Sequence, residues 1–94
     1  MVEFRIEDGK LVCAFQGRMD TVAAMKLENT VDIRVREAKK PVVFDLAGVE
    51  YVSSSFIPIC LQVVKAVGKE NFSIVNAADF TRKVFTVAGL EEFL

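Results

Sequence analysis

The sequence predicts one α/β domain over residues 1–94, with a four-stranded mixed sheet and about three main helices. Three observations support this prediction. The length of 94 residues suits a single domain. The N-terminal residues alternate between apolar and charged side chains and run into a turn, which predicts a hairpin. Helical and strand patterns then alternate, and strand–helix–strand units give parallel neighbours. We therefore expect an antiparallel N-terminal strand and three parallel strands.

The hairpin is predicted first along the chain. Residues 2–7 have one apolar and one charged face, as in a strand with one wet side. Asp8-Gly9 is a strong turn signal, because such hairpin turns need positive φ angles. Residues 11–15 are apolar on both faces, so this second strand should lie inside the sheet. The charged first strand should lie at an edge.

The first helix is predicted to begin at about residue 21. Residues 17–21 form a strand-to-helix junction, with Asp20 or Thr21 as the N-cap. Beyond it, apolar side chains recur every three or four residues, as on the buried face of a helix. These residues are Ala24, Leu27, Val31, Val35 and Ala38. Lys40-Pro41 should end this helix.

A buried strand and a second helix are predicted around three consecutive serines. Residues 41–46 are β-branched and aromatic, as in an interior strand. Serine is a favoured N-cap, and Pro58 fits the first helical turn because proline lacks a backbone N–H. The second helix should therefore begin at about Ser55 and end before Gly68.

The last predicted elements are a strand over residues 72–76 and a third helix. We expect Asp79 to cap this helix and Gly89 to end it. The helix carries one apolar side, made of Phe80, Val84 and Val87 or Ala88. Three further apolar residues suggest a short terminal turn packed against the domain: Leu90, Phe93 and Leu94.

Residues 43–57, VFDLAGVEYVSSSFI, resemble the signature of STAS domains, especially those of small bacterial anti-sigma factor antagonists. The family pattern is a hydrophobic strand ending in Asp-Leu, a short loop, and Asp-Ser-Ser-Gly or Asp-Ser-Thr-Gly opening a helix. Residues 17–20 also resemble the family's Gly-x-Leu-Asp. Here Ser53 replaces the family aspartate and Phe56 the family glycine, while Pro58 replaces a small residue.

The resemblance implies a non-enzymatic signalling module that regulates transcription. The family's second hydroxyl residue is phosphorylated by a partner anti-sigma factor serine kinase, and it corresponds to Ser55, with Ser54 as the alternate. A helix N-terminus tolerates the added negative charge, whereas a bound partner would not. Candidate partner contacts are Ser53, Phe56, Ile57 and Asp20, and we expect Phe56 and Ile57 to be partly exposed at the loop.

Two alternatives remain open at this point. A STAS-like subunit could work without phosphorylation, as a scaffold in a signalling assembly or an accessory subunit of a lipid transport complex. The serines would then be cap and turn residues only. A distant alternative is a small metal-dependent hydrolase that uses Asp20 and Asp45, which we expect to approach the same carboxyl edge of the sheet.

Composition narrows the function classes further. The chain has a net charge of −1, no histidine and no basic run longer than Lys39-Lys40. We therefore expect no nucleic acid, metal or cofactor as a ligand. Cys13 and Cys60 lie in apolar runs and should be free buried thiols. No signal peptide or membrane span is evident, so we expect a cytoplasmic monomer or weak dimer. The 52% hydrophobic content predicts either a large core or an apolar partner surface.

Overall fold

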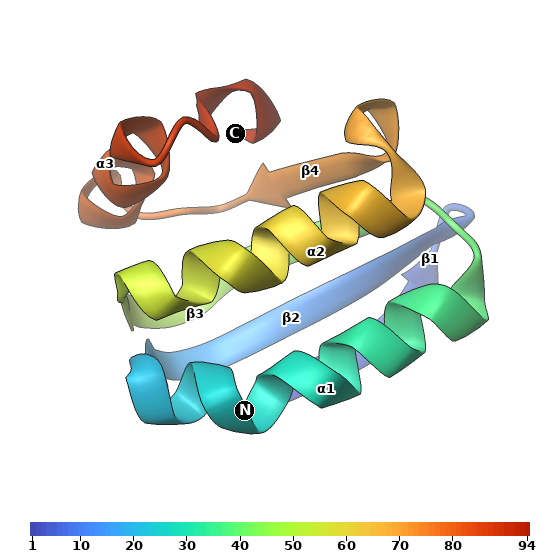
Figure 1. Cartoon of the computed structure of the whole chain (residues 1–94), viewed down its shortest axis with the longest axis horizontal. Helices are drawn as coiled ribbons and strands as arrows, with labels where there is room; N and C mark the ends of the chain where they lie inside the picture. The colour runs from blue at the N-terminus through green and yellow to red at the C-terminus, as the bar shows by residue number, and fades with distance from the viewer.

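A computed structural model describes all residues 1–94 and contains the predicted four-stranded mixed sheet (Figure 1). The strand order is β1-β2-β3-β4, with β1 antiparallel to β2 and the remaining pairs parallel. Three short 3-10 turns supplement the helices: η1 (Ser54–Phe56), η2 (Lys69–Asn71) and η3 (Glu91–Phe93). The main elements are β1 (Val2–Glu7), β2 (Lys10–Met19), α1 (Thr21–Ala38), β3 (Val42–Val52), α2 (Ile57–Val67), β4 (Phe72–Val75) and α3 (Asp79–Val87).

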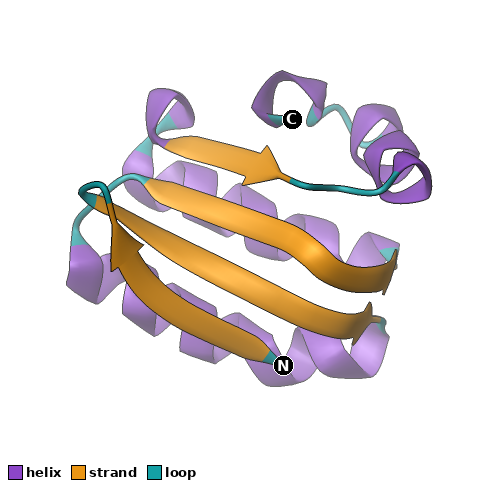
Figure 2. Ribbon diagram, turned by 180° about the vertical axis from the view of Figure 1, so that it is seen from behind, coloured by secondary structure: helices purple, strands orange, loops and turns teal.

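The helices α1 and α2 lie side by side on one face of the sheet, and the opposite face carries no helix (Figure 2). The shorter α3 lies beyond the end of β4 and contacts β3 (Figure 1). The predicted hairpin turn and edge position of β1 are confirmed. Asp8 and Gly9 have φ angles of 52° and 77°, the positive values that a tight hairpin turn requires.

The core lies between the sheet and the two helices, and phenylalanine rings form its centre. Phe15, Phe44 and Phe56 have essentially no exposed surface. The Phe15 ring lies 4.8 Å from that of Phe44 and 5.1 Å from that of Phe56, between centroids. Both pairs have the edge-on geometry that aromatic rings prefer. The predicted apolar stripe of α1 also faces this core, with Ala24, Val31 and Val35 buried.

The central strand is longer than predicted. We expected a strand to residue 46 followed by a loop, but β3 continues to Val52. Two bulges explain the difference, because β3 carries one more residue than β2 between Asp45 and Gly48, and one more between Val49 and Tyr51. The buried positions of β3 therefore change from a spacing of two to a spacing of three.

The start and the buried side of α3 differ from the prediction. Ala78 occupies the N-cap position, and Asp79 is the first helical residue, without a side-chain capping bond. Thr81 and Phe85 face the core. The predicted apolar side of the helix, which contains Phe80, is largely open to solvent instead. The predicted terminal turn is confirmed: η3 packs against the domain through the buried residues Leu90 and Phe93.

Candidate functional site

The three serines lie at the carboxyl edge of the sheet, where β2 and β3 end together. Met19 pairs with Val52 there, and the backbone N–H of Ser53 donates to the Met19 carbonyl at 2.9 Å. Two helical segments start at this edge, α1 at Thr21 and η1 at Ser54. The predicted start of the second helix was therefore correct to within one residue, although its first turn is a 3-10 turn.

Each serine has a different environment. Ser53 caps η1, and its Oγ accepts a hydrogen bond from the backbone N–H of Ser55 at 3.3 Å. The hydroxyl of Ser55 is half-buried and shares a 3.0 Å hydrogen bond with the hydroxyl of Thr21 on α1. Ser54 is exposed. The capping role that we predicted for serine here is therefore confirmed for Ser53.

Of the other predicted site residues, Asp20 and Ile57 are partly exposed and Phe56 is buried. Asp20 caps α1 as predicted, its Oδ1 accepting from the backbone N–H of Ala23 at 2.9 Å. Ile57 is partly exposed, as expected. The prediction that Phe56 is exposed was wrong. The η1 turn directs this ring into the core, where it packs edge-on against Phe15 and Phe85.

The carboxylates of Asp20 and Asp45 do not meet, so the prediction that they share one edge was wrong. Asp45 pairs with Ala14, which precedes Met19 by five residues on β2. At about 3.3 Å per residue, Asp45 therefore lies about 16 Å from the sheet edge at Met19, next to which Asp20 caps α1. The expected edge shifted because β3 extends well beyond Asp45. No group of three or more His, Cys, Asp or Glu side chains converges in a metal-binding arrangement.

Asp45 has a structural role at the exposed side of the sheet. Its Oδ1 accepts from Asn76 Nδ2 and from the backbone N–H of Ala47, both at 3.0 Å. Arg5 lies 3.8 Å from the other carboxylate oxygen. The hydrogen bond from Asn76 is the main reason why the pKa of Asp45 is lowered from its ordinary value of 3.8.

Both cysteines are free and buried, as predicted. Burial raises the pKa of the Cys13 thiol to about 12 and the pKa of the Cys60 thiol even higher. Because the thiolate is the reactive form, we expect both buried thiols to be unreactive in the folded protein. No helix combines the length and the apolar character needed to cross a membrane.

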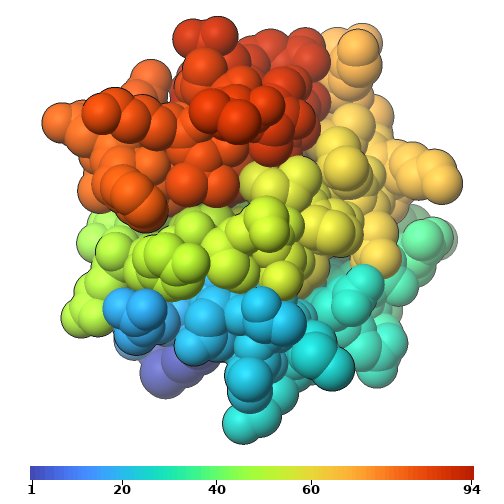
Figure 3. Space-filling model, turned by 60° about the vertical axis from the view of Figure 1, so that its left-hand side comes forward, coloured from blue at the N-terminus to red at the C-terminus, as the bar shows by residue number.

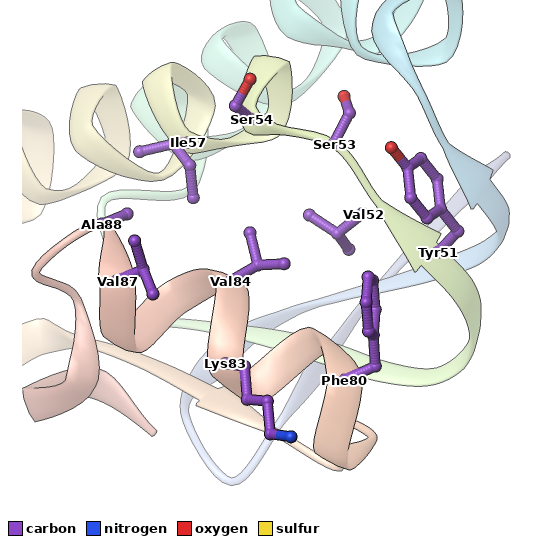
Figure 4. Close-up of a pocket in the computed structure, with 10 residues that line it drawn as sticks. All are labelled: Tyr51, Val52, Ser53, Ser54, Ile57, Phe80, Lys83, Val84, Val87 and Ala88. Atoms are coloured by element: carbon purple, nitrogen blue, oxygen red, sulfur yellow. The ribbon is translucent and has the colours of Figure 1, made fainter.

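An apolar groove beside the serine loop was not identified as a site from the sequence. It has a volume of about 440 Å³, and we call it the α3 groove (Figure 4). Figure 3 shows the orange to red surface of the α3 region directly against the yellow-green surface that contains the start of α2. The apolar side predicted for the third helix could have indicated this groove, because an apolar side that does not pack into the core leaves an apolar surface exposed. Its apolar walls come from the end of β3, the start of α2 and one side of α3: Tyr51, Val52, Ile57, Phe80, Val84 and Val87.

Aromatic contacts define one end of the α3 groove. The rings of Tyr51 and Phe80 stack with centroids 6.3 Å apart and an angle of 26° between their planes. The guanidinium of Arg18 lies 4.7 Å from the centre of the Tyr51 ring, within cation–π distance. Lys83 also lines the groove, so the charged groups at the groove described here, Lys83 and Arg18, are cationic.

Comparisons with known proteins agree with this geometry. The family model described as "Mlab, STAS domain" matches residues 2–94. The putative anti-sigma factor antagonist BtrV of Bordetella bronchiseptica is 29% identical over 84 residues, which cover 87% of this chain and 72% of that protein. An anti-sigma factor antagonist structure from Mycobacterium paratuberculosis is 29% identical, with a TM-score of 0.85, covering 98% of this chain and 80% of that one.

A more distant similarity extends to the fold alone. The anti-sigma factor antagonist SpoIIAA in its unphosphorylated form has 14% sequence identity and a TM-score of 0.81. The match covers 99% of this chain and 84% of that chain. The SpoIIAA structure therefore has the same arrangement of sheet and helices as the one described above.

Proposed function

The chain belongs to the STAS domain family, and from this premise we propose that it is a non-enzymatic signalling module of the anti-sigma factor antagonist type. It would bind an anti-sigma factor serine kinase, or a similar protein partner, through the carboxyl edge of its sheet. The observation that carries the proposal is the row of three hydroxyl side chains at this edge, where two helical segments begin. The relatives named as anti-sigma factor antagonists add support.

Phosphorylation of Ser55 would act as the switch in this proposal. A phosphate would bring a charge of about −1.5 to −2 to a position beside the N-termini of α1 and of the η1–α2 segment. Helix N-termini stabilise anions by about 0.3–1 kcal/mol, so the fold should tolerate the modification. A partner that covers the hydroxyl would have to desolvate a dianion, so its affinity should fall.

Ser54 is the alternate acceptor, because it is the exposed hydroxyl of the three. Phosphorylation at Ser55 requires the hydrogen bond between the Ser55 and Thr21 hydroxyls to break. The loss of a typical hydrogen bond costs about 0.5–1.5 kcal/mol. The loop therefore offers two candidate phosphorylation sites: Ser55, whose hydroxyl is hydrogen-bonded, and Ser54, whose side chain is exposed. Mapping of the modified residue distinguishes them.

The test uses a partner captured from native lysate on the tagged chain. Incubation with a captured kinase and ATP should add one phosphate, mapped by mass spectrometry to Ser55 or, as the alternate, Ser54. If Ser55 is the acceptor, Ser55→Ala should abolish phosphorylation of the chain, whereas the matched control Ser54→Ala should still be phosphorylated. Ser55→Asp should weaken partner binding by about tenfold or more, or about 1.4 kcal/mol. A kinase that binds the chain, modifies neither serine and binds Ser55→Asp normally would refute the switch.

A second function is favoured by one observation at the same loop. Phe56 occupies the position of the family glycine and is fixed in the core, so the loop cannot open there without exposing the ring. This favours a STAS subunit that works without phosphorylation, as a scaffold in a signalling assembly or an accessory subunit of a lipid transport complex. Capture of a transporter ATPase in place of a kinase, with unmodified serines, would identify this function.

A further inference from the structure

The α3 groove is an apolar surface that the fold leaves uncovered. Phe80 is 59% exposed and Val87 is 89% exposed, although both are large apolar residues on an ordered helix. With Val84 they form a row along two turns of α3, facing Ile57 at the start of α2 (Figure 4). Apolar residues gathered in one place on a surface, unlike scattered ones, mark an interaction site.

We propose that the α3 groove anchors an amphipathic helix of the partner protein, one that carries acidic residues beside its apolar stripe. The inference rests on the proposed function, because it specifies how the protein partner is held. The row along α3 spans residues 80–87, about 10 Å of helix, which suits two or three apolar side chains at helical spacing from the partner.

The shape of the groove favours a segment of a protein over a small ligand. A small-molecule pocket typically buries about 70–90% of its ligand. Here the walls formed by Phe80 and Val87 are mostly open, so a fatty acid or similar molecule would remain largely in water. A helix laid along the groove would cover these walls with its own side chains and bury both surfaces.

The charges around the groove indicate which charge the partner helix should carry beside its apolar stripe. Lys83 lines the groove and Arg18 is stacked on its aromatic end, while no carboxylate lines it. Asp79, the acidic residue of α3, lines an adjoining depression that shares Lys83 and Val87 with the groove, and the cationic Arg82 lies there as well. A helix with Glu or Asp beside its apolar stripe would therefore meet complementary charge.

Ser53 and Ser54 are among the residues that line the α3 groove, but their hydroxyls point away from its α3 wall. Figure 4 shows the side chains of Ser53 and Ser54 pointing away from Val84 and Val87. A partner helix in the groove would thus lie against the serine loop, with the hydroxyls of Ser53 and Ser54 directed away from it. The groove would provide an anchor that persists after phosphorylation, and the hydroxyl side would provide the contact that changes.

The test uses a fluorescent peptide of about four helical turns, with leucines at spacings of three and four and glutamates flanking them. Binding is followed by anisotropy, and the contact is mapped by amide chemical shifts of the labelled protein. A peptide with lysines in place of the glutamates tests the charge, and laurate tests a lipid-like ligand. Phe80→Ser and Lys83→Glu test the groove, with Ile33→Ser as the control, since Ile33 is exposed on α1, away from the groove.

The glutamate peptide should bind in the α3 groove, and Phe80→Ser and Lys83→Glu should each weaken it by about tenfold. The lysine peptide should bind at least about tenfold more weakly, and Ile33→Ser should change nothing. Equal binding of both peptides, shifts mapped elsewhere, binding of laurate alone, or self-association through the groove would each overturn the proposal. No kinase is present, so failure here would leave the phosphorylation experiment unaffected.

Discussion

Replacing Phe56 with alanine should destabilise the whole domain. The ring is completely buried and lies within 6.4 Å of three other rings, those of Phe15, Phe44 and Phe85, measured between centroids. Buried phenylalanine-to-alanine substitutions typically cost about 3–5 kcal/mol, because the transfer energy is lost and a cavity remains. With no exposed surface and three aromatic neighbours, we expect a loss of about 4 kcal/mol.

This loss is large relative to the stability of a small domain. At about 0.05–0.15 kcal/mol per residue, a chain of this length is stable by about 5–14 kcal/mol. Phe56→Ala should therefore remove between a third and most of the free energy of unfolding. The melting temperature should fall by about 15–30 °C, since domains of this size lose about 4–8 °C per kcal/mol.

Urea unfolding followed by circular dichroism measures the effect, with Phe80→Ala as the matched control. Phe80 is 59% exposed, so its replacement should cost less than about 1 kcal/mol. The slope of the transition should remain the same in both variants if each unfolds in two states. Equal losses for the two variants, or a loss below about 1 kcal/mol for Phe56→Ala, would refute the assignment of Phe56 to the core.

Three further predictions concern other side chains. Asp20→Ala should lower stability by about 1 kcal/mol in thermal unfolding, because α1 loses its N-cap; an unchanged melting temperature would contradict this. Asp45 has a lowered pKa, so the stability it contributes is present above about pH 4 and lost as pH falls through the folded-state pKa. Asn76→Ala should reduce this acid-dependent loss in unfolding experiments between about pH 5 and 2. Cys13 and Cys60 should resist iodoacetamide at about pH 8 until urea unfolds the protein, and mass spectrometry would reveal any native-state labelling.

The parts of the fold that depend on local signals were predictable from the sequence. The Asp8-Gly9 turn needs only the backbone preferences of two residues, and Asp20 caps α1 through a hydrogen bond within its own first turn. The apolar stripe of α1 follows the period of a single helix. These features required no knowledge of which elements pack together.

The misplaced features depend on packing between elements. The buried positions of β3 are three residues apart beyond Leu46, at Val49 and Val52, and this spacing conceals a strand because it lacks the period of two. On α3, one apolar side and the Thr81–Phe85 side compete for the core, and periodicity alone does not choose between them. The burial of Phe56 was hidden for the same reason, since the space it fills is created by residues far along the chain.

The two bulges make β3 tolerant of changes in length. Each bulge contains one residue without a partner on β2, so removal of Ala47 would leave a regular ladder from Asp45 to Val49, while Gly48 and later residues kept their partners and the second bulge remained. A deletion in a regular part of the strand would instead turn every following side chain to the opposite face. A variant of this chain that lacks Ala47 should therefore fold with Ser53 still at the same edge of the sheet.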